Sequence, residues 1–196
     1  ENGKRVQALG GAKNHMIVMP DADLDAAADA AISAGYGSAG ERCMAVSVVV
    51  AVGEVADELI AKIADRMPQV TVGDGTAPGI EMGPLITRDA LERVTGFVAG
   101  AEGEGARLVV DGRELDVPAG GFFIGPSLVD GVTPGMRVYD EEIFGPVLSV
   151  VRVSSYDDAV ALINDNRYAN GTAVFTRDGK TARQFEFDIE VGMVGV

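Results

Sequence analysis

The chain has 196 residues, and its 16 Lys and Arg against 30 Asp and Glu give a formal net charge of −14 at pH 7. This acidity argues against a basic surface for nucleic-acid backbones and against contact with an anionic membrane. A single Cys rules out an internal disulfide framework or a Cys-rich zinc site, and a single His argues against a histidine-based metal centre or a Ser-His-Asp triad.

Both ends of the chain look like cuts. The sequence begins at Glu1 without an initiator Met, and it closes on the apolar residues 192–196 without a polar tail. We therefore expect both ends to lie inside a longer protein. A targeting peptide cannot be judged from such a chain, and a cytoplasmic location is expected for a bacterial source.

Strand-like apolar runs alternate with helical patterns through the first half of the chain. The run 45–52 is rich in β-branched residues, which is typical of a buried strand, and it is far too short to span a bilayer. In chain order we predict a strand at 15–19, a helix from the capping residues Asp21 and Asp23 to Ser33, a strand at 45–52, a helix at 55–67, a short strand at 70–72 and a helix capped by Thr87.

The second half is rich in Gly and Pro between residues 118 and 146, which predicts loops. Before this stretch, Asp111-Gly112 separates extended runs at 107–110 and 113–117 and predicts a two-residue hairpin. After it we predict a strand at 148–153, a helix from Ser155 to about Asn166, a strand at 173–176, a helix at 180–187 and a last strand at 193–196.

The alternation of strands and helices predicts one α/β domain over residues 1–196. We expect an open, mostly parallel twisted sheet with helices on both faces and an inserted hairpin. No repeat or low-complexity linker divides the chain. Functional loops in such sheets lie at the carboxyl ends of the strands, so we expect the site there.

Cys43 is the first candidate for chemistry. It ends the segment Gly37-Ser38-Ala39-Gly40-Glu41-Arg42-Cys43, whose small residues allow a ligand and the backbone to approach the sulfur. Arg42 could stabilise a thiolate or bind a carboxylate through two parallel hydrogen bonds. The alternatives are a small buried hydrophobe at Cys43 and a solvated surface charge at Arg42.

A second candidate is the segment 139–147, Tyr-Asp-Glu-Glu-Ile-Phe-Gly-Pro-Val. Its carboxylates can accept hydrogen bonds from sugar hydroxyls, and an adjacent ring can pack on a flat heterocycle. This suits nucleotide binding, although three acids in a row are also typical of a solvated turn. His15 lies in an apolar strand, where we expect a hydrogen-bonded core residue and no catalytic base.

These segments resemble the signatures of the aldehyde dehydrogenase superfamily. Residues 36–43 are similar to its active-site cysteine motif, and residues 142–147 to its nicotinamide-ribose motif. Shorter matches in the family's order extend the resemblance over essentially the whole chain: Leu9-Gly10-Gly11, Met82-Gly83-Pro84-Leu85, Gly121-Phe122-Phe123-Ile124-Gly125-Pro126 and Gly171-Thr172-Ala173-Val174-Phe175-Thr176.

One departure from the family pattern points to a branch. Most members carry a Glu before Leu-Gly-Gly that activates water against the acyl-enzyme, and here the position is Ala8. The segments 6–15 and 40–45 resemble the CoA-acylating, methylmalonate-semialdehyde branch. Without a carboxylate base, a better nucleophile than water, such as the CoA thiolate, can take the acyl group.

The resemblance implies an NAD-dependent oxidation of methylmalonate or malonate semialdehyde, with decarboxylation, to propionyl-CoA or acetyl-CoA. It implies Cys43 as the nucleophile that carries the thioacyl group and Arg42 as the ligand of the substrate carboxylate. Glu142, Phe144 and the backbone of Leu9 would hold the nicotinamide half of NAD. Coenzyme A would be the co-substrate, and no metal is expected.

The resemblance also implies missing parts. A dinucleotide-binding domain would precede residue 1, and oligomerisation strands of a homodimer or homotetramer would lie outside the chain, so we expect residues 1–196 alone to be inactive. The alternatives are an aldehyde dehydrogenase for another substrate and a binding domain of the same fold with an inert cysteine. A Cys-His hydrolase is a weaker alternative, because the only His lies on a strand.

Overall fold

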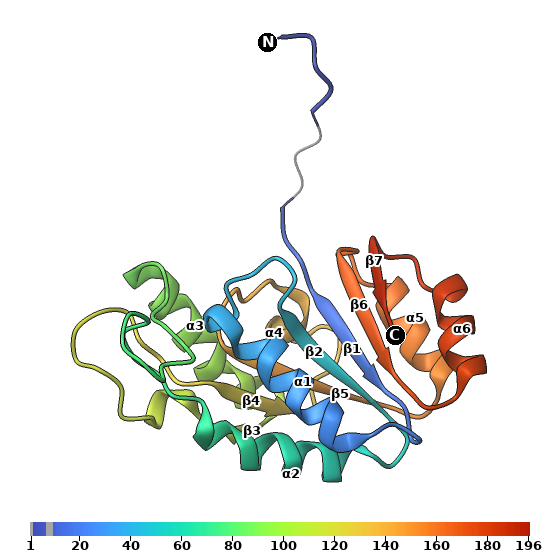
Figure 1. The fold of residues 1–196 in the computed structure, drawn as a ribbon, viewed down its shortest axis with the longest axis horizontal. Coiled ribbons are helices and arrows are strands. Elements are labelled where there is room, and N and C mark those ends of the chain that lie inside the picture. Colours follow the sequence, from blue (N-terminus) through green and yellow to red (C-terminus); the bar gives the residue numbers. More distant parts are fainter. Residues whose placement is uncertain (1, 7–9) are drawn as a thin grey trace.

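Seven strands form one sheet in the computed structural model, which describes residues 2–6 and 10–196 (Figure 1). In chain order they are β1 (Asn14–Val18), β2 (Val46–Val52), β3 (Arg107–Val110), β4 (Ser127–Asp130), β5 (Val147–Val153), β6 (Gly171–Phe175) and β7 (Met193–Gly195). Their order in space is β3-β4-β5-β2-β1-β6-β7, and every neighbouring pair is parallel except β3 and β4. The predicted mostly parallel sheet is confirmed.

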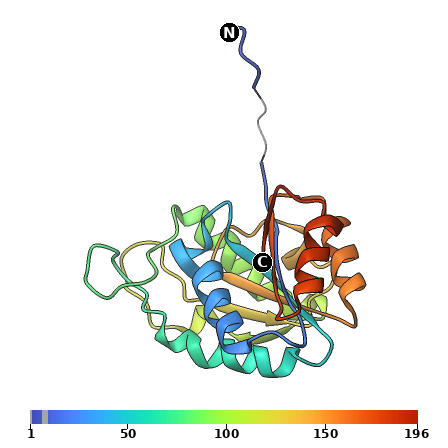
Figure 2. The ribbon, with the colours of Figure 1, turned by 45° about the vertical axis from the view of Figure 1, so that its right-hand side comes forward.

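Helices cover both faces of the sheet. The crossover from β1 to β2 and that from β5 to β6 run in opposite directions across the sheet, so right-handed connections place their helices on opposite faces. The first face carries α1 (Leu24–Tyr36) and α2 (Ala56–Arg66), and the second carries α5 (Tyr156–Asn164) and α6 (Gly179–Asp188) (Figures 1 and 2). The remaining helices are α3 (Arg88–Ala101) and the short α4 (Arg137–Asp140), which pack on each other.

The valine-rich run predicted as a buried strand is the centre of the core. Residues 48–51 of β2 have no exposed surface, because β5 and β1 flank this strand while helices cover the sheet. Burial on both faces explains why the run is continuously apolar and does not alternate with polar residues. β1 beside it is buried along its whole length.

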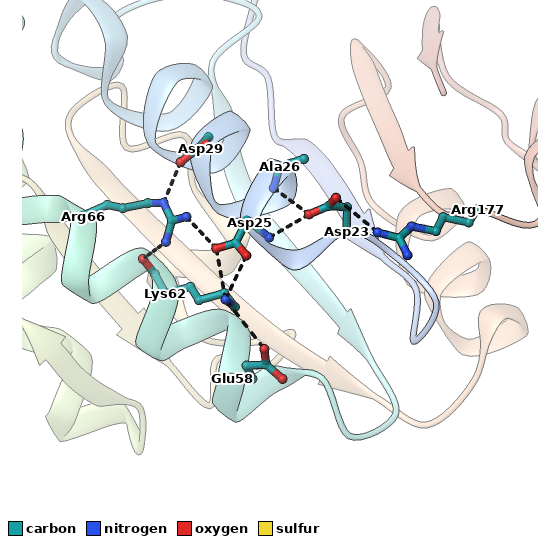
Figure 3. Close-up of polar contacts among 8 residues, drawn as sticks. All are labelled: Asp23, Asp25, Ala26, Asp29, Glu58, Lys62, Arg66 and Arg177. Carbon is teal, nitrogen blue, oxygen red and sulfur yellow. Dashed lines mark hydrogen bonds and ion pairs between the residues drawn. The ribbon is translucent and has the colours of Figure 1, made fainter.

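Helix α1 starts where the sequence predicts, because its cap is present. The carboxylate of Asp23 accepts hydrogen bonds from the backbone N–H groups of Asp25 and Ala26, each at 3.1 Å, and so satisfies two free donors of the first turn (Figure 3). Arg177 pairs with the same carboxylate at 3.1 Å and links α1 to the segment after β6. The start of α1 is thereby tied to the segment that follows β6.

An ion-pair network ties α1 to α2 on the surface. Asp25 on α1 accepts hydrogen bonds from Lys62 at 3.0 Å and from Arg66 at 2.8 Å, and Arg66 also reaches Asp29 at 2.5 Å (Figure 3). Hydrogen bonds from Arg66 and Lys62 hold the pKa of Asp25 below its usual value. Exposed pairs contribute little individually. The shared carboxylate of Asp25 bridges α1 to two residues of α2.

Two details of the predicted middle region are wrong. Residues 113–117 form no strand, because Gly112–Glu114 is a turn of 3-10 helix capped by Asp111. The inserted antiparallel pair exists, but the partner of β3 is β4, which begins fifteen residues after Gly112. The pair nearest to the connecting loop joins Val110 to Leu128. The predicted strand at 70–72 is reduced to a single bridge between Val72 and Met82.

Among residues 2–6 and 10–196, no helix has the length and apolar character that a membrane crossing needs.

Candidate active site

The candidate residues lie at the amino ends of the parallel strands, which corrects the expectation of the carboxyl ends. Cys43 comes just before β2, and the segment 142–144 comes just before β5, its parallel neighbour. The rule for carboxyl ends concerns loops that lead from a strand into a helix. Cys43 lies in a loop that leads from α1 into β2, so it is found at the amino ends of the strands.

The loop that carries Cys43 has an unusual backbone. Ser38, Ala39 and Gly40 follow one another with φ values of +53°, +54° and +70°, in the left-handed region that side-chain-bearing residues avoid. Among the described residues, the only other non-glycine with positive φ is Phe144, at +51°. Such strained positions gather at functional sites, where the surrounding structure holds them in place. The three non-glycine residues with positive φ lie in two segments, the loop before Cys43 and the segment before β5.

Gly40 brings these two segments into contact. A Cβ at this position would lie 2.2 Å from the carbonyl oxygen of Gly145 and 3.2 Å from that of Gly35, so only glycine fits. The contact forms one side of a crevice between the cysteine loop and the segment before β5. Its lining includes Gly35, Gly40, Arg42 and Ala45 from the first segment, and Glu142, Phe144 and Gly145 from the second.

Cys43 is exposed and its backbone is held on two sides. Its carbonyl oxygen accepts hydrogen bonds from Nδ2 of Asn14 at 2.9 Å and from Nδ2 of Asn170 at 2.6 Å. The turn around it closes with a hydrogen bond from the N–H of Ala45 to the carbonyl of Arg42 at 3.0 Å. The expected alternative of a small buried hydrophobe is therefore wrong: the thiol is accessible and the main chain beneath it is fixed.

Arg42 lies at the rim of the crevice, beside the carboxyl end of α1. Its Nη2 donates to the carbonyl of Ser33 at 3.5 Å and lies 3.1 Å from where a Cβ of Gly37 would be. A cation at this end of a helix is favourable, because the last carbonyls are unpaired. The side chain is exposed, so it remains accessible to an anionic group in the crevice.

Glu142 and Phe144 present two groups that fit a nucleotide. The Glu142 side chain is half-buried, and the Phe144 ring is 37 % exposed although aromatic rings are normally buried. Their segment is held from outside by Arg93, which donates to the carbonyl of Ile143. A carboxylate beside an exposed ring, across from small residues, can bind a ribose and a flat heterocycle.

Lys13 and Asn14 are part of this site, and they are not among the predicted residues. Lys13 is 2 % exposed, and its ammonium donates to the carbonyls of Val138 and Glu141, each at 2.7 Å. Asn14 is 3 % exposed and reaches the cysteine loop instead. The signal available in the sequence was a Lys-Asn pair directly before an apolar strand, where charged residues are seldom buried without a partner.

His15 is a core residue, as predicted. It is 1 % exposed, and its Nε2 lies 3.1 Å from the hydroxyl of Tyr139, which in turn donates to the carbonyl of Leu162 at 3.3 Å. Burial, with a smaller contribution from the nearby Lys13 charge, lowers the pKa of His15 to about 4. A histidine in this environment is neutral at pH 7.

We expect His15 to make the fold acid-sensitive. Its folded pKa of about 4 lies below the unfolded value of 6.5, so the unfolded chain takes up the proton first as the pH falls. The stability of the folded state is then lost below pH 6.5, by about 2 kcal/mol between pH 7 and pH 5. Urea unfolding at both pH values measures it. His15→Gln should remove that part of the pH dependence, and an equal loss in both proteins would contradict the assignment.

Leu9 and Ala8 lie outside the described residues, so the structure adds nothing to the roles expected for them. In the described ranges no group of three or more His, Cys, Asp or Glu side chains is arranged to hold a metal ion.

Comparison with known proteins places the whole chain in one family. The aldehyde dehydrogenase family model matches residues 1–196. The chain is 58 % identical over 199 residues to a malonate-semialdehyde dehydrogenase of Pseudomonas aeruginosa, covering all of this chain and 40 % of that protein. It is 46 % identical over 196 residues to the mitochondrial, acylating methylmalonate-semialdehyde dehydrogenase of Arabidopsis thaliana, covering 99 % of this chain and 32 % of that protein.

Solved structures agree with these matches. A methylmalonate-semialdehyde dehydrogenase from Oceanimonas doudoroffii superposes with a TM-score of 0.95 at 56 % identity, over 99 % of this chain and 40 % of that one. A Sinorhizobium meliloti protein complexed with NAD also gives 0.95, at 53 % identity, over 100 % and 40 % of the two chains. This chain thus spans about 40 % of the length of these relatives. With its fold, its cysteine loop and its full-length family match, the chain belongs to the aldehyde dehydrogenase family.

Proposed function

We propose that residues 1–196 are the cysteine-bearing part of a longer NAD-dependent enzyme that oxidises malonate or methylmalonate semialdehyde. The observation that carries this proposal is the meeting of two segments at the amino ends of β2 and β5. One carries the exposed Cys43, whose neighbours Gly40, Arg42 and Ala45 line a crevice, and the other contributes Glu142 and Phe144 to the same crevice. The similarity to named semialdehyde dehydrogenases supports the substrate class.

The chemistry begins at Cys43. Its thiolate attacks the aldehyde carbon and forms a thiohemiacetal, while the backbone N–H of Cys43 helps to hold the oxyanion. NAD, when bound, supplies the hydride acceptor that this oxidation needs. Glu142 accepts hydrogen bonds from the ribose, and Phe144 limits the position of the nicotinamide ring. Loss of hydride from the thiohemiacetal carbon leaves a thioester on Cys43.

The acyl group leaves by transfer to coenzyme A. Ala8 stands where most of the family has the glutamate that activates water, so hydrolysis of the thioester lacks its base. The thioester carbonyl lies β to the substrate carboxylate, so it can accept the electron pair released as carbon dioxide leaves. Arg42 binds that carboxylate beforehand. The resulting thioester enolate takes a proton from solvent. Attack by the CoA thiolate then releases the Cys43 thiolate and gives acetyl-CoA from malonate semialdehyde, or propionyl-CoA from its methyl derivative.

The longer enzyme supplies what this chain does not contain. A dinucleotide-binding domain before residue 1 would hold the adenine half of NAD, and the enzyme would assemble as a homodimer or homotetramer. We therefore expect residues 1–196 alone to bind NAD weakly and to show no dehydrogenase activity.

The test uses the longer enzyme with three aldehydes. We expect NADH formation with malonate and methylmalonate semialdehydes that requires CoA, and much slower reduction with propanal, which has no carboxylate for Arg42. Mass spectrometry should find acetyl-CoA or propionyl-CoA as product. A free acid formed at the same rate without CoA would overturn the acyl-transfer step. Equal rates with propanal would overturn the proposed substrate class. No reaction with any aldehyde would favour the alternative of a binding domain with an inert cysteine.

A further inference from the structure

Lys13 fixes the backbone of the segment that carries Glu142. Its ammonium donates to two main-chain carbonyls, those of Val138 within α4 and Glu141 just after it. A buried ammonium so placed compensates the unpaired carbonyls at the end of a short helix. The contact acts on the path of the main chain, one residue before Glu142, and so on the position of its side chain.

The charges around Lys13 keep it protonated near neutral pH. Burial lowers its pKa to about 8, and the carboxylates of Glu142, Asp140 and Glu141 oppose that shift. Two further titratable groups lie close by along the chain, His15 two residues after Lys13 and Tyr139 directly after Val138. The pKa of His15 lies at about 4 and that of Tyr139 is raised above its usual value, so neither titrates between pH 7 and pH 9.

Asn14 holds the main chain of the cysteine loop, as Lys13 holds that of the Glu142 segment. Its Nδ2 donates to the carbonyls of Cys43 at 2.9 Å and Ala45 at 2.8 Å. The pairing of β1 with β2 is irregular between Asn14 and His15, and such bulges redirect a side chain beside a site. Neighbouring residues of a strand point to opposite sides. Lys13 directly precedes β1 and Asn14 is its first residue, so the start of one strand holds both segments of the candidate site.

We propose that Lys13 and Asn14 are positioning residues that set the separation of the Cys43 sulfur from the nicotinamide pocket, Lys13 through the Glu142 segment and Asn14 through the cysteine loop. This inference rests on the proposed function. It predicts separable effects: Lys13 governs how well NAD is held, and Asn14 governs how well the thiol is aligned with a bound aldehyde. A residue that merely stabilised the fold would change both properties together.

The experiment measures NAD binding and turnover separately in the longer enzyme. Lys13→Met should raise the dissociation constant of NAD, followed by fluorescence quenching, about 10-fold, and should leave the alkylation rate of Cys43 by iodoacetamide within about twofold. Asn14→Leu should lower kcat about 10-fold and leave the NAD dissociation constant within about twofold. An unchanged NAD dissociation constant in Lys13→Met, or parallel losses of both properties in both variants, would overturn the inference.

Two control variants remove an ammonium and an amide group from positions outside the candidate site. Lys180→Met deletes an exposed ammonium on α6, and Asn164→Leu deletes an amide that bridges α5 to the carbonyl of Asp188 at 2.8 Å. Neither should alter NAD binding or kcat once differences in thermal unfolding are allowed for. Equal effects of Lys180→Met and Lys13→Met would remove the assignment to Lys13.

The pH dependence of NAD binding by the wild-type enzyme tests the same inference independently of how the variants fold. NAD affinity should weaken as the pH rises from 7 to 9.5, because Lys13 loses its proton with a pKa of about 8. Lys13→Arg keeps its charge over this range and should flatten the profile. A flat wild-type profile would overturn the role of Lys13. Failure of the wild-type enzyme to bind NAD at any pH would instead overturn the proposed function, and the inference with it.

Discussion

Replacing Cys43 with serine in the longer enzyme should abolish aldehyde oxidation, with a loss of more than about 1,000-fold in kcat. A serine hydroxyl is a far weaker nucleophile than a thiolate and needs a general base such as a histidine to activate it. His15, the one histidine, is buried at the hydroxyl of Tyr139. NADH formation in single-turnover experiments measures the chemical step directly.

The same substitution should leave the fold intact. Cys43 is exposed, so its sulfur contributes little to packing, and its carbonyl contacts with Asn14 and Asn170 involve only the main chain. We expect the midpoint of thermal unfolding and the NAD dissociation constant of Cys43→Ser to match those of the wild type. Retention of activity would show that the thiol is structural, and a fall in stability would mean that the lost activity reports on folding.

Substituting Gly40 with alanine should lower the stability of the fold strongly. Its φ of +70° is costly for any residue with a Cβ, and that Cβ would meet the Gly145 carbonyl oxygen at 2.2 Å. The left-handed conformation costs about 1–2 kcal/mol and the overpacking about 1–3 kcal/mol, so we expect a loss of about 3 kcal/mol in the free energy of unfolding. Because the backbone must move apart at the crevice, NAD affinity should fall as well.

A glycine in open space provides the matched control. Gly96 lies within α3, and a Cβ there would meet nothing within 4 Å. Gly96→Ala should therefore stabilise the protein by about 0.5–1 kcal/mol through the gain in helix propensity. Chemical denaturation of both variants gives the comparison. If Gly40→Ala were as stable as the wild type, the close approach of the two segments would not exist in solution.

Much of the sheet follows from the sequence because local signals agree there. The valine-rich run 46–52 is apolar on both faces, so it has to be a central strand of a sheet that is covered on both sides. Asp23, Thr87 and Ser155 each cap the helix that follows them. The Asp111-Gly112 hairpin was wrong because an Asp-Gly pair also suits a short 3-10 turn. The choice between them depended on a partner strand at 127–130, sixteen residues away from Asp111 at its start.

The sequence allowed the chemically important residues of the candidate site to be identified, but it did not show where in the fold they come together. Cys43 and Glu142 could be singled out, but the sequence carried no sign that their segments meet through Gly40 and Gly145. The left-handed run before Cys43 contains Ser38 and Ala39, whose side chains give no local preference for it. Tertiary contacts impose that geometry, so propensity could not reveal it.

The position of β1 also has a consequence for hydrogen exchange. This strand lies between β2 and β6 and is buried throughout, so its amide hydrogens should exchange only when the whole domain unfolds. The turn that carries Cys43 lies outside the ladder and can open in smaller fluctuations. The amide hydrogens of the turn around Cys43 should therefore exchange much faster than those of β1. Nucleotide binding should slow exchange in the turn and leave the exchange rates in β1 unchanged.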